Sequence, residues 1–219
     1  MSEFTAPEDL SAWIANSLAS GEHVLATSNQ GTILLYRDGA REFVVKTAMG
    51  FGPLRRARQA TLRREYQAYR RLAGMRGVPA CLGLAQGRHL LLEHVQGSPY
   101  REVHIPDRAH WFAQLLAIIR EFHHRGVAHG DLKSKSNLLV TRDGAPCVLD
   151  FGTAVLRKPG FRPLNHRLFA YARQLDLNAW VKHKYHGRYE DAEPADRELL
   201  NYSAFESLLR SYRNWRDAR

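Results

Sequence analysis

Two carboxylates and one amide stand at the ends of a single hairpin pattern in the middle of the chain. The stretch 127–152, VAHGDLKSKSNLLVTRDGAPCVLDFG, predicts a loop, an apolar strand, a turn and a second apolar strand. Asp131 and Asn137 precede the first strand and Asp150 closes the second, so strand pairing brings the three side chains to one end. Their oxygens suit a divalent cation and a hydroxyl about to lose its proton. The alternative is a surface hairpin in which these polar residues are incidental.

Two motifs occur together in this stretch. HGDLK at 129–133 resembles the catalytic loop of the protein-kinase-like phosphotransferases, and DFG at 150–152 resembles their magnesium-binding motif. The resemblance implies ATP as the phosphoryl donor and Mg²⁺ as the metal. It further implies that Asp131 accepts the proton of the acceptor hydroxyl and that Lys133 neutralises the transferring phosphoryl group.

Asn137 and Asp150 are the magnesium ligands that the resemblance implies. The family's loop places its Asn five residues after its Asp, whereas Asn137 comes six residues after Asp131. The interval of thirteen residues from Asn137 to Asp150 matches the family, so we place the additional residue within 132–136. The metal pair is therefore expected to stay in register, and the insertion leaves open whether Asp131 retains the geometry of a base.

An upstream lysine and glutamate extend the resemblance. Lys46 ends an apolar-apolar-Lys signature like that of the third kinase strand, whose lysine holds the α and β phosphates. Glu65 follows nineteen residues later, within a turn of an apolar stripe at helical spacing in 54–72. The resemblance implies that Glu65 pairs with Lys46 and orients it. Without such a partner, a lysine at a strand end is a solvated charge.

The first half of the chain predicts a small antiparallel lobe. A leading helix should end near Gly21, and five apolar stretches punctuated by turns predict five strands: 24–27, 32–36, 43–47, 82–84 and 90–92. By the resemblance, the turn that holds Gly31 covers the nucleotide phosphates. Backbone groups near Glu93 and Val95 would bind adenine at a hinge between lobes. A plain hairpin and a plain sheet edge are the alternatives for these two places.

The second half predicts a compact helical lobe. Asp107 can cap a helix that runs to about His124, and we interpret His123 and His124 as its frayed, solvated end. His129 is interpreted as a packed scaffold residue. Asp176, in a later helix, either braces the catalytic loop or lies on the surface.

Three further features are open to function. His183 and His186 have a spacing compatible with a metal, but no further Cys or His accompanies them. The approach to the 54–72 helix is basic, and so is the segment from Pro194, which alternates apolar, aromatic and arginine residues. Both basic segments suit either an anionic partner or ordinary solvation and packing. The basic residues in question are Arg55, Arg56, Arg58, Arg63, Arg64, Arg197, Arg210, Arg213, Arg216 and Arg219.

Composition bounds the function classes. The 219 residues are 44% hydrophobic and 25% charged, as in ordinary globular proteins, and 32 basic against 22 acidic residues give a net charge of +10. That charge predicts an anionic partner. Cys81 and Cys147 have no ligand-like spacing and should be reduced. No apolar run reaches the ~18 residues of a membrane span, and an acidic N-terminus argues against a secretory signal, so we expect a cytoplasmic protein.

The resulting prediction is an α+β, bilobal, protein-kinase-like fold: an N-terminal lobe with the leading helix (1–95) and a C-terminal catalytic lobe (96–219). The short segment after Gly152 and the basic surface resemble the bacterial lipopolysaccharide core kinases, which phosphorylate heptose or Kdo, and within them the small toluene-tolerance proteins. This resemblance implies an anionic glycolipid acceptor and peripheral contact with the inner membrane. A compact Ser/Thr protein kinase and a non-catalytic nucleotide-binding scaffold are the alternatives, and nucleic acid fits the aromatic tail less well than a membrane does.

Overall fold

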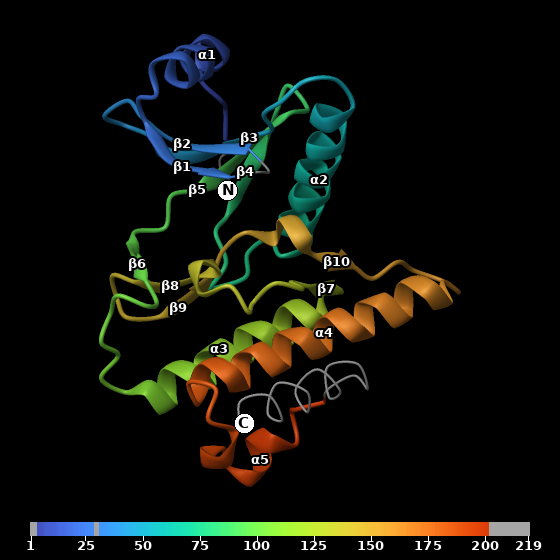
Figure 1. Ribbon diagram of the computed structural model, residues 1–219. Coiled ribbons are helices and arrows are strands. Elements are labelled where there is room, and N and C mark those ends of the chain that lie inside the picture. Colours follow the sequence, from blue (N-terminus) through green and yellow to red (C-terminus); the bar gives the residue numbers. More distant parts are fainter. Residues whose placement is uncertain (1–3, 29–30, 202–219) are drawn as a thin grey trace, which may run out of the picture.

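The chain forms a sheet-rich N-terminal lobe above a mainly helical C-terminal lobe (Figure 1). The structure is a computed structural model that describes residues 4–28 and 31–201. Its helices are α1 (Leu10–Ser20), α2 (Gly52–Arg71), α3 (Arg108–His124), α4 (Pro163–Lys184) and α5 (Pro194–Arg197). Its strands are β1 (Val24–Ser28), β2 (Gly31–Arg37), β3 (Glu42–Thr47), β4 (Cys81–Ala85), β5 (His89–Glu93), β6 (Gly97–Pro99), β7 (Val127–Ala128), β8 (Leu138–Thr141), β9 (Pro146–Val148) and β10 (Val155–Leu156).

The N-terminal lobe is one antiparallel sheet with strand order β1-β2-β3-β5-β4. Alternation of side chains along β2, β3 and β5 gives the sheet one apolar face. That face packs against α1 through Leu10 and Ile14. Helix α1 ends at Gly21, whose left-handed φ of 76° lets its N–H bond to the carbonyl of Ser17. The predicted leading helix and antiparallel strands are confirmed.

Helix α2 connects the sheet to the centre of the molecule. Its inner face carries Leu62, Glu65 and Tyr69, which recur every three or four residues and are buried. The Tyr69 ring meets Phe151 edge-on, with ring centroids 5.2 Å apart. Helix α2 therefore rests directly on the segment that follows Asp150.

The C-terminal lobe is built on α3 and α4, which lie side by side beneath the short strands (Figure 1). The Asp107 carboxylate accepts from the His110 N–H at 2.9 Å, which confirms the predicted cap of α3. The Trp180 indole N–H of α4 donates to the Phe112 carbonyl of α3 at 2.8 Å. Above the helices, β8 pairs with β9 and β6, and β7 pairs with β10.

The interpretation of His123 as a solvated helix end was wrong. His123 is 6% exposed because it lies one turn after buried Ile119, on the inner face of α3, whereas His124 is exposed. Both cysteines are free, Cys147 buried and Cys81 half-buried, as expected. The aromatic and basic tail beyond Asn201 lies outside the described residues. Within the described part of the chain, no helix is long and apolar enough to cross a bilayer.

Candidate active site

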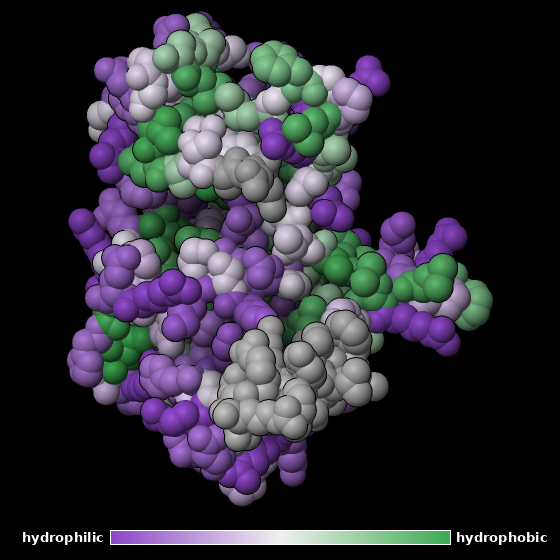
Figure 2. Space-filling view, viewed as in Figure 1, coloured by the Kyte–Doolittle hydropathy of each residue, from purple (hydrophilic) through white to green (hydrophobic). Residues whose placement is uncertain are grey.

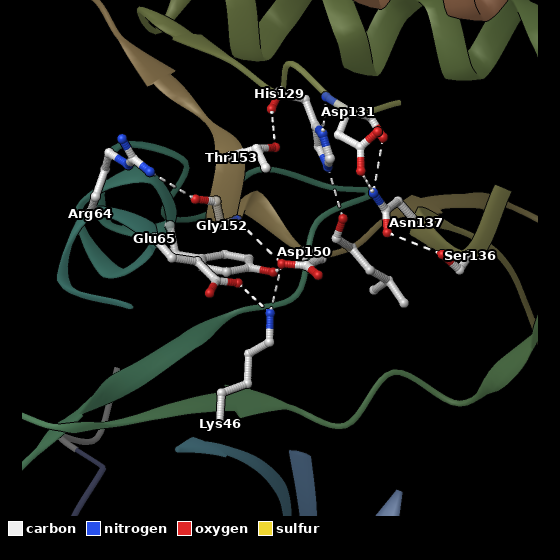
Figure 3. Close-up of polar contacts among 12 residues, drawn as sticks. Lys46, Arg64, Glu65, His129, Asp131, Ser136, Asn137, Asp150, Gly152 and Thr153 are labelled. Atoms are coloured by element: carbon white, nitrogen blue, oxygen red, sulfur yellow. Dashed lines mark hydrogen bonds and ion pairs between the residues drawn. The ribbon is translucent and has the colours of Figure 1, made fainter. Parts of the chain in front are cut away.

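A lysine joins two carboxylates where the lobes meet (Figure 3). The Nζ atom of Lys46, on β3, lies 2.6 Å from Oε1 of Glu65, on α2, and 2.9 Å from Oδ1 of Asp150. Glu65 is 2% exposed because it belongs to the inner stripe of α2. The structure thus brings together residues from three separate parts of the sequence.

The charges of this cluster depend on one another. Burial would lower the pKa of Lys46, but the neighbouring Glu65 and Asp150 carboxylates outweigh burial and raise it. Burial would raise the pKa of Asp150, whereas the Lys46 ammonium holds it below its ordinary value. Burial raises the pKa of Glu65 against the attraction of Lys46. Lys46 is therefore held as an ammonium in the cluster.

The loop from Asp131 to Asn137 accommodates its additional residue in a 3-10 turn, Lys135–Asn137. The Ser134 N–H donates to the Asp131 carbonyl at 3.3 Å, and the Asn137 N–H donates to the Ser134 carbonyl at 3.2 Å. The Asn137 amide group then reaches back and donates to the Asp131 carbonyl at 2.9 Å. The insertion is absorbed between Asp131 and Asn137 without separating the two residues.

Asp176 fixes the start of this loop. It is fully buried and accepts from the backbone N–H groups of His129 and Gly130, both at 2.8 Å. It also lies 2.9 Å from Nε2 of His123. The sequence left Asp176 as either a brace for this loop or a surface residue, and the structure shows the brace. The three hydrogen bonds replace the hydration that this carboxylate loses on burial. They also fix the backbone that carries Asp131.

His129 connects the loop to the strand that leads to Asp150. Its Nε2 lies 2.9 Å from the Leu149 carbonyl, and its Nδ1 accepts from the Asp131 N–H at 3.2 Å. These two bonds place the ring hydrogen on Nε2. His129 is buried, as its interpretation as a scaffold residue requires.

The backbone turns sharply at Asp150. Its φ of 62° is left-handed, and its carboxylate accepts from the Gly152 N–H at 3.2 Å. The Tyr69 hydroxyl accepts from the Asp150 N–H at 3.3 Å, and Phe151 is buried beside that ring. Several contacts thus hold an uncommon backbone conformation, which aims the carboxylate of Asp150 between the lobes.

A pocket lies under β2 and β3, between them and α2. Gly31 begins β2 so close to β3 that a Cβ at this position would lie 2.1 Å from the Thr47 carbonyl oxygen, so only glycine fits. The lining provides cations and hydroxyls, a combination that suits phosphate groups. The lining residues are Gly31, Thr32, Ile33, Lys46, Thr47, Arg58, Thr61, Leu62, Glu65 and Asp150.

Glu93 and Val95, the residues expected at the hinge, do not line this pocket. The Glu93 carboxylate accepts from the Ala80 N–H at 2.9 Å, and the Glu93 N–H donates to the Ala80 carbonyl at 2.9 Å. Val95 follows between β5 and β6. Glu93 therefore closes the sheet edge with its side chain and its N–H.

The donor set fits a magnesium ion bound mainly through phosphates. Asp150 and Asn137 supply oxygen atoms, which Mg²⁺ prefers, and the side chain of Asp150 is 43% exposed. Among residues 4–28 and 31–201, no group of three or more His, Cys, Asp or Glu could hold a metal. A protein that provides only one or two carboxylate or amide ligands matches the usual way magnesium nucleotides are held.

Three lysines lie near one another where α4 meets the loop that carries Asp131. Lys133 is exposed on the loop, and Lys182 stands near the end of α4. Partial burial and the positive charges of Lys133 and Lys135 lower the pKa of Lys182. In the described part of the chain, no carboxylate forms an ion pair with any of the three. This cluster could not be predicted from the sequence, because α4 must fold back on the loop to form it.

His183 holds α4 against the loop. Its Nε2 lies 2.8 Å from the Leu132 carbonyl, and the side chain is 2% exposed. His186 is exposed and lies beyond the end of the helix. His183 is therefore part of the packing between α4 and the loop, since its ring faces a backbone carbonyl.

The comparisons with known proteins agree with this architecture. No family model matches the chain. The structure superimposes on the Rio2 kinase from Chaetomium thermophilum with a TM-score of 0.58 and 16% sequence identity, over 87% of this chain and 67% of that one. The chain has a protein-kinase-like fold.

Sequence similarity is confined to a short region. The chain is 36% identical over 87 residues to the sperm motility kinase Tcr mutant form of Mus musculus, a match that covers 39% of this chain and 16% of that protein. It is 34% identical over 77 residues to sperm motility kinase 3A of Mus musculus, covering 35% of this chain and 14% of that protein. The matches thus span only about a sixth of these relatives' length, and they name no acceptor.

Proposed function

We propose that this protein is an ATP-dependent phosphotransferase with a hydroxyl acceptor. The observation that carries the proposal is the contact of Lys46 with both Glu65 and Asp150, beside the loop that carries Asp131 and Asn137. A kinase-like fold in which the lysine lay elsewhere would not place an ammonium between these two carboxylates. The pairing supports a nucleotide-competent site.

Each residue has a proposed role. Lys46 would bind the α and β phosphates, with Glu65 holding its ammonium in place, and Gly31 would let the start of β2 approach the phosphates. Backbone groups of Glu93 and Val95 would bind adenine. Asn137 and Asp150 would hold Mg²⁺, which neutralises phosphate charge when bound.

Asp131 would accept the proton of the acceptor hydroxyl. Among the described residues, its carboxylate receives only a long, 3.5 Å contact from the Asn137 amide, while the stronger amide bond goes to its backbone carbonyl. The carboxylate is therefore left available to a hydroxyl. Lys133, exposed two residues later, would offset the charge of the transferring group.

We propose an anionic sugar of the lipopolysaccharide inner core as the acceptor. The three lysines at 133, 135 and 182 support this, because their unpaired charges lie beside Asp131 and favour an anionic substrate. The connection from Thr153 to Arg162 is also short, which leaves little chain to seat a peptide. Such an acceptor lies in a membrane, so the proposal includes contact with the cytoplasmic face of the inner membrane.

A compact Ser/Thr protein kinase is the second candidate. Lys133 favours it, since HGDLK matches the protein-kinase loop more closely than the loop of sugar kinases. Transfer of label from ATP distinguishes the two: we expect label in purified lipopolysaccharide core and none in the proteins of a lysate stripped of lipid. Label in lysate proteins alone would reject the glycolipid acceptor, and absence of turnover with either would support a non-catalytic scaffold.

The lysine cluster provides a sharper test of the acceptor. The Lys135→Ser/Lys182→Ser variant should raise KM for the anionic acceptor several-fold while leaving KM for ATP unchanged. Arg120→Ser/Arg142→Ser removes the same charge at two exposed sites elsewhere and is the matched control. Equal KM values in the two variants would remove the cluster from acceptor binding.

A further inference from the structure

The start of α4 exposes an apolar stripe. Phe161 is 90% exposed, Leu164 81%, Leu168 54% and Tyr171 48%. The three helical members are spaced by four and three residues, so they share one face, and Phe161 precedes them at the tip. Figure 2 shows hydrophobic surface on this projecting end of the helix, bordered by hydrophilic surface.

This stripe is separate from the face that holds α4 in the fold. Phe169 and Ala172 are buried against Ala128, with Val155 packed beside them. The outer stripe makes no part of the hydrophobic clusters of the described residues. Exposed apolar side chains grouped in this way, rather than scattered singly, mark an interaction surface.

All the charged residues in the segment around the stripe are basic. Between Gly152 and Leu175 the sequence contains no Asp or Glu. Within residues 157–171, four basic side chains are exposed, and among the described residues none of them is paired with a carboxylate. These are Arg157, Lys158, Arg162 and Arg167.

Charge decides between the possible occupants of the stripe. A second copy docked through the same face would place these cations against their own counterparts. The chain's tail beyond Asn201 brings four arginines and only Glu206 and Asp217, so it would also add positive charge. An anionic lipid surface offers the opposite charge and an apolar layer for Phe161 and Leu164.

We propose that residues 157–171 form a membrane-docking surface, in which Phe161, Leu164, Leu168 and Tyr171 enter the interface of an anionic bilayer and the neighbouring cations contact its headgroups. This inference rests on the proposed function, because it identifies the surface that brings the protein to a membrane-embedded acceptor. Docking itself involves neither ATP nor Asp131. It can therefore be measured apart from phosphotransfer.

The test uses the full chain and vesicles of phosphatidylcholine with or without phosphatidylglycerol. We expect sedimentation with the anionic vesicles only, weakened by salt. Phe161→Ser/Leu164→Ser/Leu168→Ser should weaken this binding by about tenfold or more, and Lys158→Glu/Arg162→Glu/Arg167→Glu by a similar factor. Phe51→Ser is the matched control, since Phe51 is 92% exposed at the start of α2, next to the other basic cluster.

Three other results would each overturn the proposal. Loss of binding in Phe51→Ser with retention in both triple variants would place the membrane contact on α2. Unchanged vesicle binding with a lower melting temperature in the serine variant would assign the stripe to the chain's own tail. Unchanged binding with a dimer that dissociates in the serine variant would assign it to a second copy. Label transfer to soluble core sugar by the triple variants would show that the proposed phosphotransfer stands whatever the docking result.

Discussion

Lys46 and Asp150 are 104 residues apart in the sequence, and 2.9 Å separates Nζ of one from Oδ1 of the other. The contact joins the sheet of the N-terminal lobe to the end of the central hairpin. Because Glu65 holds the same ammonium at 2.6 Å, α2 is fixed to both. One lysine thus sets the relative position of three elements on which the proposed chemistry depends.

Asp150→Ala should abolish binding of magnesium-ATP or nearly so. The substitution removes the proposed metal ligand and one of the two carboxylates that hold Lys46. Calorimetric titration with magnesium-ATP measures the effect, and Glu102→Ala, at an exposed carboxylate, is the control. Unchanged affinity in Asp150→Ala would exclude Asp150 from the metal role.

Asp131→Asn should keep nucleotide affinity and lose about 10²-fold or more in turnover, the scale of general-base assistance. The 3-10 turn after Ser134 keeps the Asn137 amide on the Asp131 carbonyl, so the variant should retain the loop geometry. Single-turnover measurements with labelled ATP separate chemistry from binding. Turnover equal to that of the unmodified protein would mean that the carboxylate is not the base.

The fold was largely predictable because its signals are local. Turn residues and apolar alternation predicted the five strands, and Asp107 predicted the start of α3, since each signal depends on neighbours within a few residues. The resemblance to the protein-kinase-like family predicted the ion pair of Lys46 and Glu65, because the lysine motif and the glutamate nineteen residues later match that family's pair.

The features that could not be predicted depend on how distant segments pack. His123 lies at the end of a helix and looked solvated, yet its face of α3 meets Asp176 on α4. The contact of His183 with Leu132 and the approach of Lys182 to the loop that carries Asp131 require the same packing of α4. The 3-10 turn that absorbs the insertion was also not visible in the sequence.

Stability should fall as the pH drops from neutral to 5, partly through His183. Burial lowers the pKa of His183 from 6.5 to about 4. Protonation would also place a hydrogen on Nδ1, which is buried and has no partner among the described residues. The unfolded chain therefore binds a proton at His183 more readily than the folded chain does. The stability that neutral His183 contributes is thus complete above pH 6.5 and is lost as the pH falls toward 4.

For His183 alone this predicts a loss of about 2 kcal/mol in the free energy of unfolding between pH 7 and pH 5. Urea unfolding at the two pH values measures it. His183→Gln removes the titration and should show a correspondingly smaller loss. Burial also lowers the pKa of His89 to about 4, but His89 is present in both proteins. The difference between their losses of stability therefore reports on His183. The same loss in both proteins would contradict this assignment.

Asp176→Asn should destabilise the protein and slow turnover without weakening nucleotide binding. Its carboxylate accepts from His129, Gly130 and His123, and an amide can offer only one oxygen to these donors. Unpairing buried donors predicts a loss of about 3 kcal/mol in the free energy of unfolding.

The loss of turnover in Asp176→Asn should exceed what the unfolded fraction explains, because the braced backbone of His129 and Gly130 carries Asp131 into place. Measuring kcat and KM for ATP well below the melting temperature separates the two effects. Asp191→Asn, at a carboxylate whose side chain is 51% exposed, should change neither stability nor turnover. A variant with lower stability but unchanged kcat would show that Asp176 supports the fold and does not position the loop for catalysis.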